Sequence, residues 1–277
     1  METTVTEVVE KQVHQNGIFF PSDKVMLDLR DLKKVYPTPK GDYVVLEHLN
    51  LQILKEEFVT IIGHSGCGKT TMLSMIAGLN GITGGKISVL GNLIKGPGPD
   101  RGVIFQAPSL MPWMTALQNV LLGVNRVFPH ATKAQRKDIA KYYLQKVGLE
   151  SAFDKKATEL SQGEQQRVGI ARAFAIKPKV LLLDEPFGML DSLTRGELQD
   201  ILIEIWNKEK ITAVMITHDV DEAIFLADRV VMMTSGPRAK IGDVLEIDFE
   251  RPRSRKSVLD HDDYYKYRKH LIDFLEH

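Results

Sequence analysis

The chain has 277 residues, a formal net charge of zero from 36 basic and 36 acidic residues, and one cysteine. Its length allows one large core with an attached lobe, and its neutral balance argues against a general nucleic-acid binder, which needs a net basic face. A single cysteine excludes an internal disulfide, and because no basic-then-apolar export signal opens the chain we expect a reducing, cytoplasmic location.

The N-terminal part predicts an extension followed by two strands. Residues 1 to about 24 show no turn chemistry and no clear period, which indicates a loosely ordered extension. Lys24 to Leu32 and Tyr43 to Ile53 alternate apolar and polar residues, as strands with one covered face do. Val35 to Asp42, with two prolines and a glycine, predicts a long turn between them. Tyr36, expected on this turn, either lies against an adenine ring or packs on the protein.

The stretch from Gly63 to Thr71 has the spacing of a phosphate-binding loop, G-x-x-x-x-G-K-[ST]. It follows a buried strand predicted at Phe58 to Ile62 and opens a helix predicted at Met72 to Ala77. This context disfavours the alternative, a glycine-rich turn that binds nothing. Glycines let successive backbone N–H groups turn toward a phosphate chain, and the helix aims its positive dipole end at the same charge. The predicted nucleotide-binding residues of the loop are Gly63, His64, Ser65, Gly66, Cys67, Gly68, Lys69, Thr70 and Thr71.

Three side chains of this loop have expected roles. Lys69 reaches the β- and γ-phosphates, Thr70 offers its hydroxyl to Mg²⁺, and Thr71 lies near the α-phosphate. The loop therefore predicts a nucleotide bound through its phosphates together with Mg²⁺, and the resemblance described below implies that this nucleotide is ATP.

Further along, Lys86 to Leu90 and Val103 to Phe105 are predicted strands. Gln106 directly follows the second one, where an amide either orients a water or a metal ligand or merely caps the strand. Residues 107 to about 160 are helical in character, and Thr132 begins a helix with capping-box spacing. We expect a helical lobe inserted into an α/β core.

Ala107 to Thr115 combines large apolar side chains with prolines. Such a loop either folds onto its own core or offers an apolar socket to a partner, since Trp and Met favour interfaces.

Two adjacent carboxylates end the next predicted strand. Ser161 and Glu164 have capping-box spacing at the start of a helix, and an unbroken apolar run then leads to Asp184 and Glu185. Ligands lie at this end of a parallel sheet, and two like charges there are costly unless a cation or a proton relieves them. A metal ion is the expected explanation.

The last third predicts a helix at Glu197 to Trp206 and a strand at Ile211 to Ile216, which ends in Thr217 and His218. A histidine there is either structural or catalytic. Closing strands follow at Arg229 to Met233 and Ala239 to Ile247.

The tail begins with a basic turn at Arg251 to Arg255, expected to be solvated. The final helix carries an apolar stripe that should pack onto the body. The stripe consists of Tyr264, Tyr267, Leu271 and Leu275.

In their order and spacing, these motifs resemble the nucleotide-binding subunit of ATP-binding cassette (ABC) transporters, over about residues 25 to 245. The resemblance implies that Tyr36 stacks on adenine and that Gln106 touches Mg²⁺ and signals to a membrane subunit. Asp184 then positions Mg²⁺, Glu185 is the general base, and His218 is the switch histidine. Lys69 completes the implied catalytic set.

The resemblance also identifies a signature motif and an interface loop. Ser161 and Gly163 correspond to the signature that binds the γ-phosphate of another subunit's ATP, and Asp191 belongs to the loop that crosses the dimer interface. This signature departs from the usual Leu-Ser-Gly-Gly-Gln at two places. Gln162 replaces a glycine, so no positive φ is expected there. Glu164 replaces a glutamine and adds negative charge, so its contribution to ATP binding stays open.

The implied fold is α/β, a P-loop NTPase of the ABC type with an antiparallel β subdomain and an inserted α-helical subdomain. Residues 1–24 are the extension, 25–250 the ATPase domain with its helical subdomain at about 107–160, and 251–277 a tail with a terminal helix. No apolar run approaches the roughly 18 residues of a membrane-spanning helix. The spans of a transporter would therefore come from another chain.

A finer resemblance concerns the importers for nitrate, sulfonates and taurine. It rests on Gly98 to Gln106, on Leu110 to Trp113 and on the Arg-Pro-Arg tail. The chain is most similar to ATPase subunits of cyanobacterial nitrate/nitrite importers, and bicarbonate and cyanate importers are related.

This resemblance implies a set of partners and a location. The partners are a second ATPase subunit, either a longer paralogue or a copy of this chain, transmembrane permease subunits and a solute-binding protein or domain. The protein would be peripheral on the cytoplasmic face of the inner (plasma) membrane. A soluble ABC ATPase of DNA repair is disfavoured, because Lys69 and Asp184 enclose no long coiled coil or zinc insertion.

Overall fold

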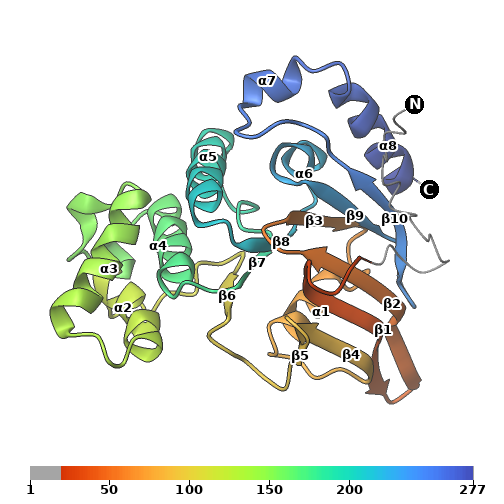
Figure 1. The fold of residues 1–277 in the computed structure, drawn as a ribbon, viewed down its shortest axis with the longest axis horizontal. Helices are drawn as coiled ribbons and strands as arrows, with labels where there is room; N and C mark the ends of the chain where they lie inside the picture. The colour runs from red at the N-terminus through yellow and green to blue at the C-terminus, as the bar shows by residue number, and fades with distance from the viewer. Residues whose placement is uncertain (1–19, 277) are drawn as a thin grey trace, which may run out of the picture.

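The computed structural model describes residues 20–276, so most of the predicted extension, residues 1–19, lies outside the described residues. Within the described part there are two sheets and a set of helices that cover them (Figure 1). The strands are β1 (Val25–Thr38), β2 (Gly41–Leu54), β3 (Phe58–Gly63), β4 (Gly84–Val89), β5 (Asn92–Leu93), β6 (Arg101–Ile104), β7 (Val180–Asp184), β8 (Thr212–Ile216), β9 (Arg229–Met233) and β10 (Ile241–Glu246). The α-helices are α1 (Lys69–Ile76), α2 (Ala116–Val127), α3 (Lys133–Lys146), α4 (Gln162–Ala175), α5 (Ser192–Glu209), α6 (Val220–Leu226), α7 (Arg255–Leu259) and α8 (Tyr264–Glu276).

The central sheet has the strand order β10-β9-β3-β8-β7-β6. The strands from β9 to β6 run parallel, and β10 closes the edge antiparallel to β9. Because β3, β8 and β7 are neighbours and run in the same direction, the polar residues that follow them meet at one edge of the sheet. This topology brings together the phosphate loop, the carboxylates after β7 and the histidine after β8.

Both faces of the central sheet are covered, as the apolar strands require. Alternate residues point to opposite sides: Phe58 and Ile62 face one cluster, and Val59 and Ile61 face the other. The first cluster includes α5, α6 and α8, and the second includes α1 and the antiparallel sheet. The fold is therefore layered, with α1 held between the two sheets.

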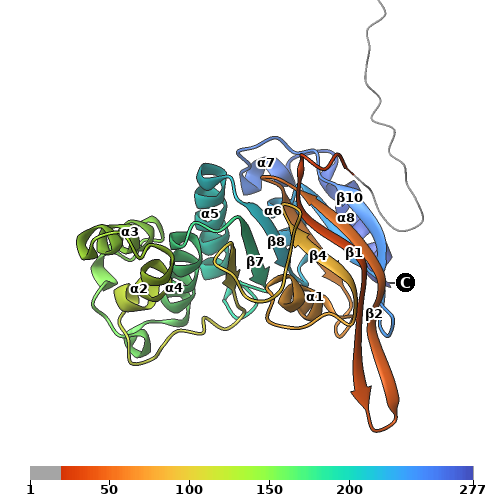
Figure 2. The same cartoon turned by 60° about the horizontal axis from the view of Figure 1, so that its bottom comes forward.

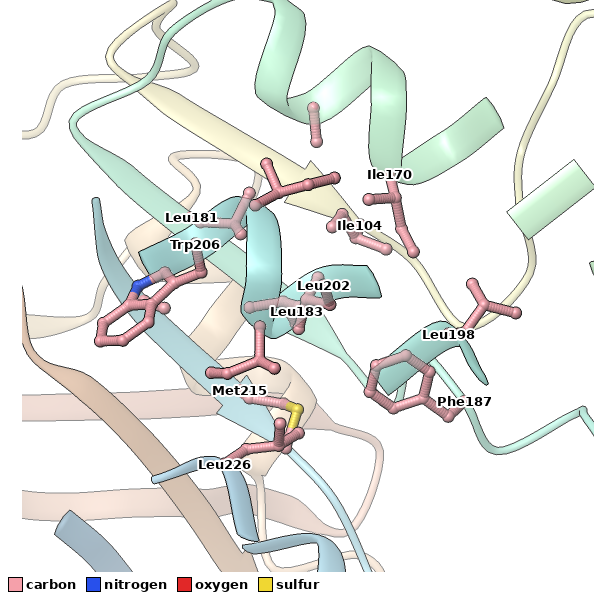
Figure 3. Close-up of a cluster of buried hydrophobic side chains, with 14 of the residues drawn as sticks. Ile104, Ile170, Leu181, Leu183, Phe187, Leu198, Leu202, Trp206, Met215 and Leu226 are labelled. Atoms are coloured by element: carbon pink, nitrogen blue, oxygen red, sulfur yellow. The ribbon is translucent and has the colours of Figure 1, made fainter. Parts of the chain in front are cut away.

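Helix α5 contributes Leu198, Leu202 and Trp206 to the first cluster (Figure 3). Trp206 packs edge-to-face on Phe58, with ring centroids 5.4 Å apart, and its indole nitrogen donates to the carbonyl of Ile211 at 2.5 Å. This packing holds the C-terminal end of α5 against the central sheet. The labelled members of the cluster are Ile104, Ile170, Leu181, Leu183, Phe187, Leu198, Leu202, Trp206, Met215 and Leu226.

The antiparallel sheet has the order β2-β1-β4-β5, and its first two strands form a long hairpin that extends from the body (Figure 2). The long turn predicted over Val35 to Asp42 was wrong. Strand β1 continues to Thr38, and Tyr36 pairs with Tyr43, so only Pro39 and Lys40 remain outside the strands. Beyond Lys33 β1 pairs with β2 alone, and a free edge of this kind tolerates a proline.

The helical lobe lies to one side of the sheets (Figure 1). Helices α2, α3 and α4 pack on one another, and α4 also contacts β6 and α5. Thr115 and Thr132 begin α2 and α3 with capping boxes, and Gly148 follows α3 with a φ of 73°. Since α4 runs to Ala175, helical packing in the lobe extends past residue 160.

The basic turn was predicted to be solvated, and this was wrong for Arg251 and Arg253, although Pro252, Ser254 and Arg255 are exposed. Arg253 is buried, and its guanidinium donates to the carbonyls of Ala227, Ile247 and Phe249. Arg251 lies over the ring of Trp206, 4.4 Å from its centroid. Carbonyls at the ends of α6 and β10 need donors in the interior, and a planar guanidinium can serve several at once.

The terminal helix packs back onto the body as predicted. Tyr264 and Leu271 of α8 are buried, and Tyr267 and Leu275 are partly buried against the first cluster. Among residues 20–276, no helix combines the length and the apolar character that crossing a membrane requires.

Candidate nucleotide-binding site

The phosphate loop lies between β3 and α1, and its conformation depends on the close packing of Gly68 against β2. Gly68 precedes α1 with a φ of 100°, a conformation that other residues rarely adopt. A Cβ at this position would lie 2.8 Å from Val45 and 2.9 Å from Leu46. A side chain would therefore push the loop away from β2 and displace the backbone that is expected to hold phosphate.

The loop divides into exposed and buried parts. His64, Ser65 and Gly66 are exposed, while the side chain of Cys67 is fully buried beneath them. Cys67 can therefore offer a ligand only its backbone. The ammonium of Lys69 donates to the carbonyls of Gly63 at 2.7 Å and His64 at 2.9 Å, so it lies under the centre of the loop.

A cavity of about 380 Å³ opens beside this loop. It is lined by part of the predicted site, including Tyr36, Glu185 and His218. The cavity is open to solvent and large enough for a nucleotide to enter. Its other lining residues are Tyr43, Val45, Ser65, Gly66, Gly68, Lys69, Thr70 and Thr71.

Thr70 and Asp184 form the candidate metal site. The Thr70 hydroxyl donates to Asp184 at 3.0 Å. Burial raises the pKa of Asp184, and the Thr70 hydrogen bond opposes that shift. A bound cation would hold this carboxyl ionised, and its oxygen ligands suit Mg²⁺.

No group of three acidic, histidine or cysteine side chains suited to a metal exists in the described part of the chain. Mg²⁺ in ATPases takes few protein ligands and completes its shell with phosphates and water, so a hydroxyl and one carboxylate fit it.

Glu185 and His218 form a close pair at the strand ends. The His218 Nε2 lies 2.7 Å from Glu185 Oε1, and Gln106 Nε2 donates to the other Glu185 oxygen at 3.3 Å. The sequence predicts that Gln106 contacts Mg²⁺. In the structure its amide contacts Glu185, the residue that follows Asp184 of the candidate metal site. Glu185 has a φ of 45°, a strained conformation for a non-glycine residue that often marks a functional site.

A pair of tyrosines, Tyr36 and Tyr43, also lines the cavity beside the phosphate loop. Tyr36 accepts a hydrogen bond from Asn80 at 2.7 Å, and the Lys34 ammonium lies 4.6 Å from the centre of its ring. Tyr43, paired with Tyr36 across the hairpin, lines the same cavity and is about half exposed. Sequence reasoning missed Tyr43, although a short turn at Pro39 and Lys40 would have predicted this pairing.

A protein-family model for ABC transporters matches residues 46–188. The chain belongs to this family. As an ABC ATPase it binds ATP with Mg²⁺ and hydrolyses it, and the phosphate loop, the Thr70 and Asp184 oxygens and the open cavity fit both groups.

The sequences of several named proteins align with most of this ABC ATPase. It is 51% identical over 258 residues to the bicarbonate transport ATP-binding protein CmpD of a Synechocystis species, covering 92% of both chains. It is 49% identical to the nitrate import ATP-binding protein NrtD of Synechococcus elongatus, covering 87% of this chain and 88% of the relative. A longer Synechocystis protein, the bicarbonate transport ATP-binding protein CmpC, is 53% identical over 88% of this chain and 37% of its own length.

Among solved structures, the fold matches that of MJ0796, described as a bacterial ABC transporter cassette in a dimeric structure. The TM-score is 0.72 at 31% sequence identity, and the match covers 81% of this chain and all of the other. MJ0796 has also been solved as a dimer in a post-hydrolysis state with ADP and phosphate.

The signature segment of the ATPase starts α4. The Ser161 hydroxyl accepts from the Glu164 backbone at 3.3 Å, and the Glu164 carboxylate accepts from the Ser161 backbone at 2.7 Å. This hydrogen bond from the Ser161 backbone lowers the pKa of Glu164. Gln162, at the first helical position, has no positive φ, as predicted. Glu164, which stands where the usual signature has glutamine, thus uses its carboxylate to cap the start of α4.

Two further predicted residues lie where α4 and α5 meet. A Cβ on Gly163 would lie 2.8 Å from the Thr194 side chain, so only glycine fits this crossing without a shift. Asp191 caps α5 and accepts from the backbones of Leu193 and Thr194, each at 3.1 Å. Ser161, Gly163, Glu164 and Asp191 do not line the cavity beside Lys69.

Proposed function

We propose that this ABC ATPase energises the uptake of a small anion through a membrane importer, with nitrate or nitrite as the first candidate and bicarbonate as the second. Support comes from the names of its relatives, since NrtD is described as a nitrate import protein and CmpD as a bicarbonate transport protein. The identities to these two relatives, 51% and 49%, are too similar to distinguish bicarbonate from nitrate. Both candidates are small anions with one negative charge.

The proposed working unit contains two cassettes. The phosphate loop and Glu185 line one cavity, but the signature residues Ser161 and Gly163 lie outside it. One chain thus provides the two halves of a site on different surfaces, and a second cassette would bring its signature helix to the ATP held here. The dimeric structures of MJ0796 support this arrangement.

Each site residue then has a stated role in hydrolysis. Lys69 and the backbone of the phosphate loop hold the β- and γ-phosphates, Tyr36 holds the adenine, and Thr70 and Asp184 hold Mg²⁺. Mg²⁺ neutralises charge on the phosphates when bound. Glu185 accepts the proton of the attacking water, while His218, 2.7 Å away, orients the carboxylate.

The observation that carries these roles is the pairing of Glu185 and His218 at the edge of the phosphate-loop cavity. Closure of two cassettes around ATP and their opening after hydrolysis would supply the movement that drives transport. Since Glu185 activates water and does not hold the nucleotide, binding and turnover are separable.

The proposed partners follow from the same assignment. CmpC is longer than this chain and shares the cassette, so a longer paralogue is a candidate for the second ATPase, and a copy of this chain is the other. Permease subunits would supply the membrane spans and a solute-binding protein or domain the selectivity. The chain would then be peripheral on the cytoplasmic face of the inner membrane.

The test of this function uses Glu185→Gln in the full-length chain. We expect MgATP binding within about threefold of wild type and turnover reduced by about a hundredfold or more, because a positioned general base typically contributes 10²–10⁴ in rate. Binding is measured by fluorescence of a labelled ATP analogue and turnover by phosphate release. An equal loss of binding and turnover would contradict the role of Glu185.

The solute is tested in cells that carry Glu185→Gln in place of the native chain. Uptake of labelled nitrate and of labelled bicarbonate is measured in the same cultures. Loss of nitrate uptake alone supports the first candidate, and loss of bicarbonate uptake alone supports the second. Retention of both would refute nitrate and bicarbonate as the solutes.

A further inference from the structure

The Glu185 and His218 pair is assembled from two separate loops. Glu185 begins the segment that leads from β7 to α5, whereas His218 lies between β8 and α6. The sheet fixes the start of each loop, and the Glu185 backbone donates to the Ile216 carbonyl at 3.0 Å. Beyond that bond, holding a carboxylate and an imidazole at 2.7 Å requires further contacts between the loops.

Arg195, in the first turns of α5, makes such contacts. One terminal nitrogen of its guanidinium donates to the Leu190 carbonyl at 3.2 Å, in the loop that follows Glu185. The other lies 3.3 Å from the carboxylate of Asp219, the residue directly after His218. A planar guanidinium holds two partners in a fixed relation, so Arg195 links the two loops that supply the pair.

Asp219 is itself held in place. One of its oxygens accepts from the Glu222 backbone at 3.0 Å and so caps α6, while the other faces Arg195. Its own backbone N–H donates to the Thr217 hydroxyl at 3.0 Å. His218 is therefore flanked by residues with little freedom, and a displacement of Asp219 would be transmitted to it.

Arg195 also lines a cavity that Glu185 and His218 share. A cavity of about 460 Å³ behind the pair is lined by Glu185, His218, Arg195, Asp219 and Glu222, among others. The Arg195 side chain is about one third exposed, and its Nε, buried, has no hydrogen-bond partner among residues 20–276. In the described part of the chain, its polar partners are Asp219 and Leu190 and not Glu185 or His218, although all three side chains line the same cavity.

We propose that Arg195 is a positioning residue for ATP hydrolysis. Its guanidinium ties the Leu190 carbonyl to Asp219 and thereby keeps His218 within reach of Glu185. The inference rests on the proposed roles of Glu185 and His218. Because a displacement of about 1 Å at a catalytic group can cost about a hundredfold in rate, the link matters for turnover more than for nucleotide binding.

The experiment is a double-mutant cycle on kcat with Arg195→Gln, Asp219→Asn and the double variant. Asp219→Asn keeps the oxygen that caps α6 and removes the charge that faces Arg195. The full-length proteins are assayed in the membrane assembly with which they purify. We expect each single variant to lower kcat by about ten- to a hundredfold with a KM for ATP within about threefold of wild type. The double variant should be no worse than either single one.

Two controls separate positioning from folding. Arg195→Lys keeps one of the two contacts and should recover part of the lost kcat. Lys208→Gln removes an exposed ion pair with Glu204 at the other end of α5 and should leave kcat unchanged. Melting temperature is measured for every variant, and if Arg195→Gln fails to fold then Asp219→Asn alone decides, since its cap is intact.

Additive losses in the double variant, unchanged kcat in Arg195→Gln, or a raised KM at constant kcat would each overturn the proposal. Glu185→Gln is measured beside these variants. If it retains turnover, the proposed roles of the pair fail. If it loses turnover while Arg195→Gln does not, the roles stand and only the positioning inference fails.

Discussion

At the scale of single residues, this ATPase buries an ionisable group, the carboxyl of Glu222, in its interior. It is 6% exposed and accepts from the Gln199 amide at 2.5 Å, and burial raises its pKa to about 7, although the Thr217 hydrogen bond opposes the shift. The folded protein therefore holds the proton of Glu222 more tightly than the unfolded chain. Its contribution to stability is complete below pH 4.5, the ordinary value, and is lost as the pH rises through about 7.

Glu222→Gln should remove this pH dependence. A shift of this size corresponds to about 3 kcal/mol, so the variant should be more stable than wild type by about 2–3 kcal/mol at pH 8 and close to it at pH 5. Urea unfolding at the two pH values measures the difference, with the exposed Glu204→Gln as control. A stability difference that is the same at both pH values would count against it.

Residues at the site show where sequence reasoning works. The phosphate loop could be predicted because its spacing is local, and its glycines and Lys69 meet within nine positions. The capping box of Ser161 and Glu164 was predicted for the same reason and is present. Tyr43 was missed, because its place beside Tyr36 depends on the register of a hairpin whose turn was placed wrongly.

At the scale of elements, two arginines at the start of the tail, Arg251 and Arg253, attach it to the body of the protein. Burial, followed by the charge of Arg251, lowers the pKa of Arg253 to about 10, a value at which it is still charged at neutral pH. Its donors satisfy the ends of α6 and β10, which links the tail to the central sheet. Sequence reasoning took this segment for a solvated turn because charge alone does not reveal burial.

Arg253→Lys should therefore destabilise the protein. An ammonium cannot reproduce the planar set of donors, so buried carbonyls lose their partners at a cost of about 2–4 kcal/mol. The free energy of unfolding in urea measures the effect. Lys256→Gln, an exposed change on α7, should lie within about 0.5 kcal/mol of wild type. An equally small effect of Arg253→Lys would refute the structural role of its guanidinium.

For the whole molecule, the helical lobe presents a surface with an exposed aromatic residue. Trp113 is 68% exposed, in the loop that follows Gln106. The buried Asn119 shapes this loop, because it accepts from the Met111 backbone at 2.8 Å and donates to the Thr115 carbonyl at 3.0 Å. The sequence left two hypotheses for this loop, that it folds onto its own core or that it binds a partner. The exposure of Trp113 favours binding to a partner. We expect a cytoplasmic segment of the permease to dock here.

Trp113→Ala should weaken assembly and leave nucleotide binding intact. An interface tryptophan commonly contributes about 2 kcal/mol or more, which corresponds to a loss of affinity of about thirtyfold. Co-purification with the permease and solute uptake measure the effect, and labelled ATP measures binding. Tyr265→Ala, at an equally exposed aromatic residue on α8, is the matched control. Normal uptake with Trp113→Ala would show that the permease docks elsewhere.

The sequence by itself determined the strands of the central sheet, the caps at Thr132 and Ser161 and the order of the motifs, because these follow from periodicity, hydrogen-bonding residues and spacing over a few positions. It also placed Asp184, Glu185 and His218 at strand ends, where the parallel direction of β7 and β8 makes them neighbours. Only the tertiary structure decided that Arg195 bridges two loops, that Arg253 is buried and that the signature lies outside the cavity. Each of these depends on contacts between segments far apart in the chain, and no local pattern specifies which side chain will meet which backbone.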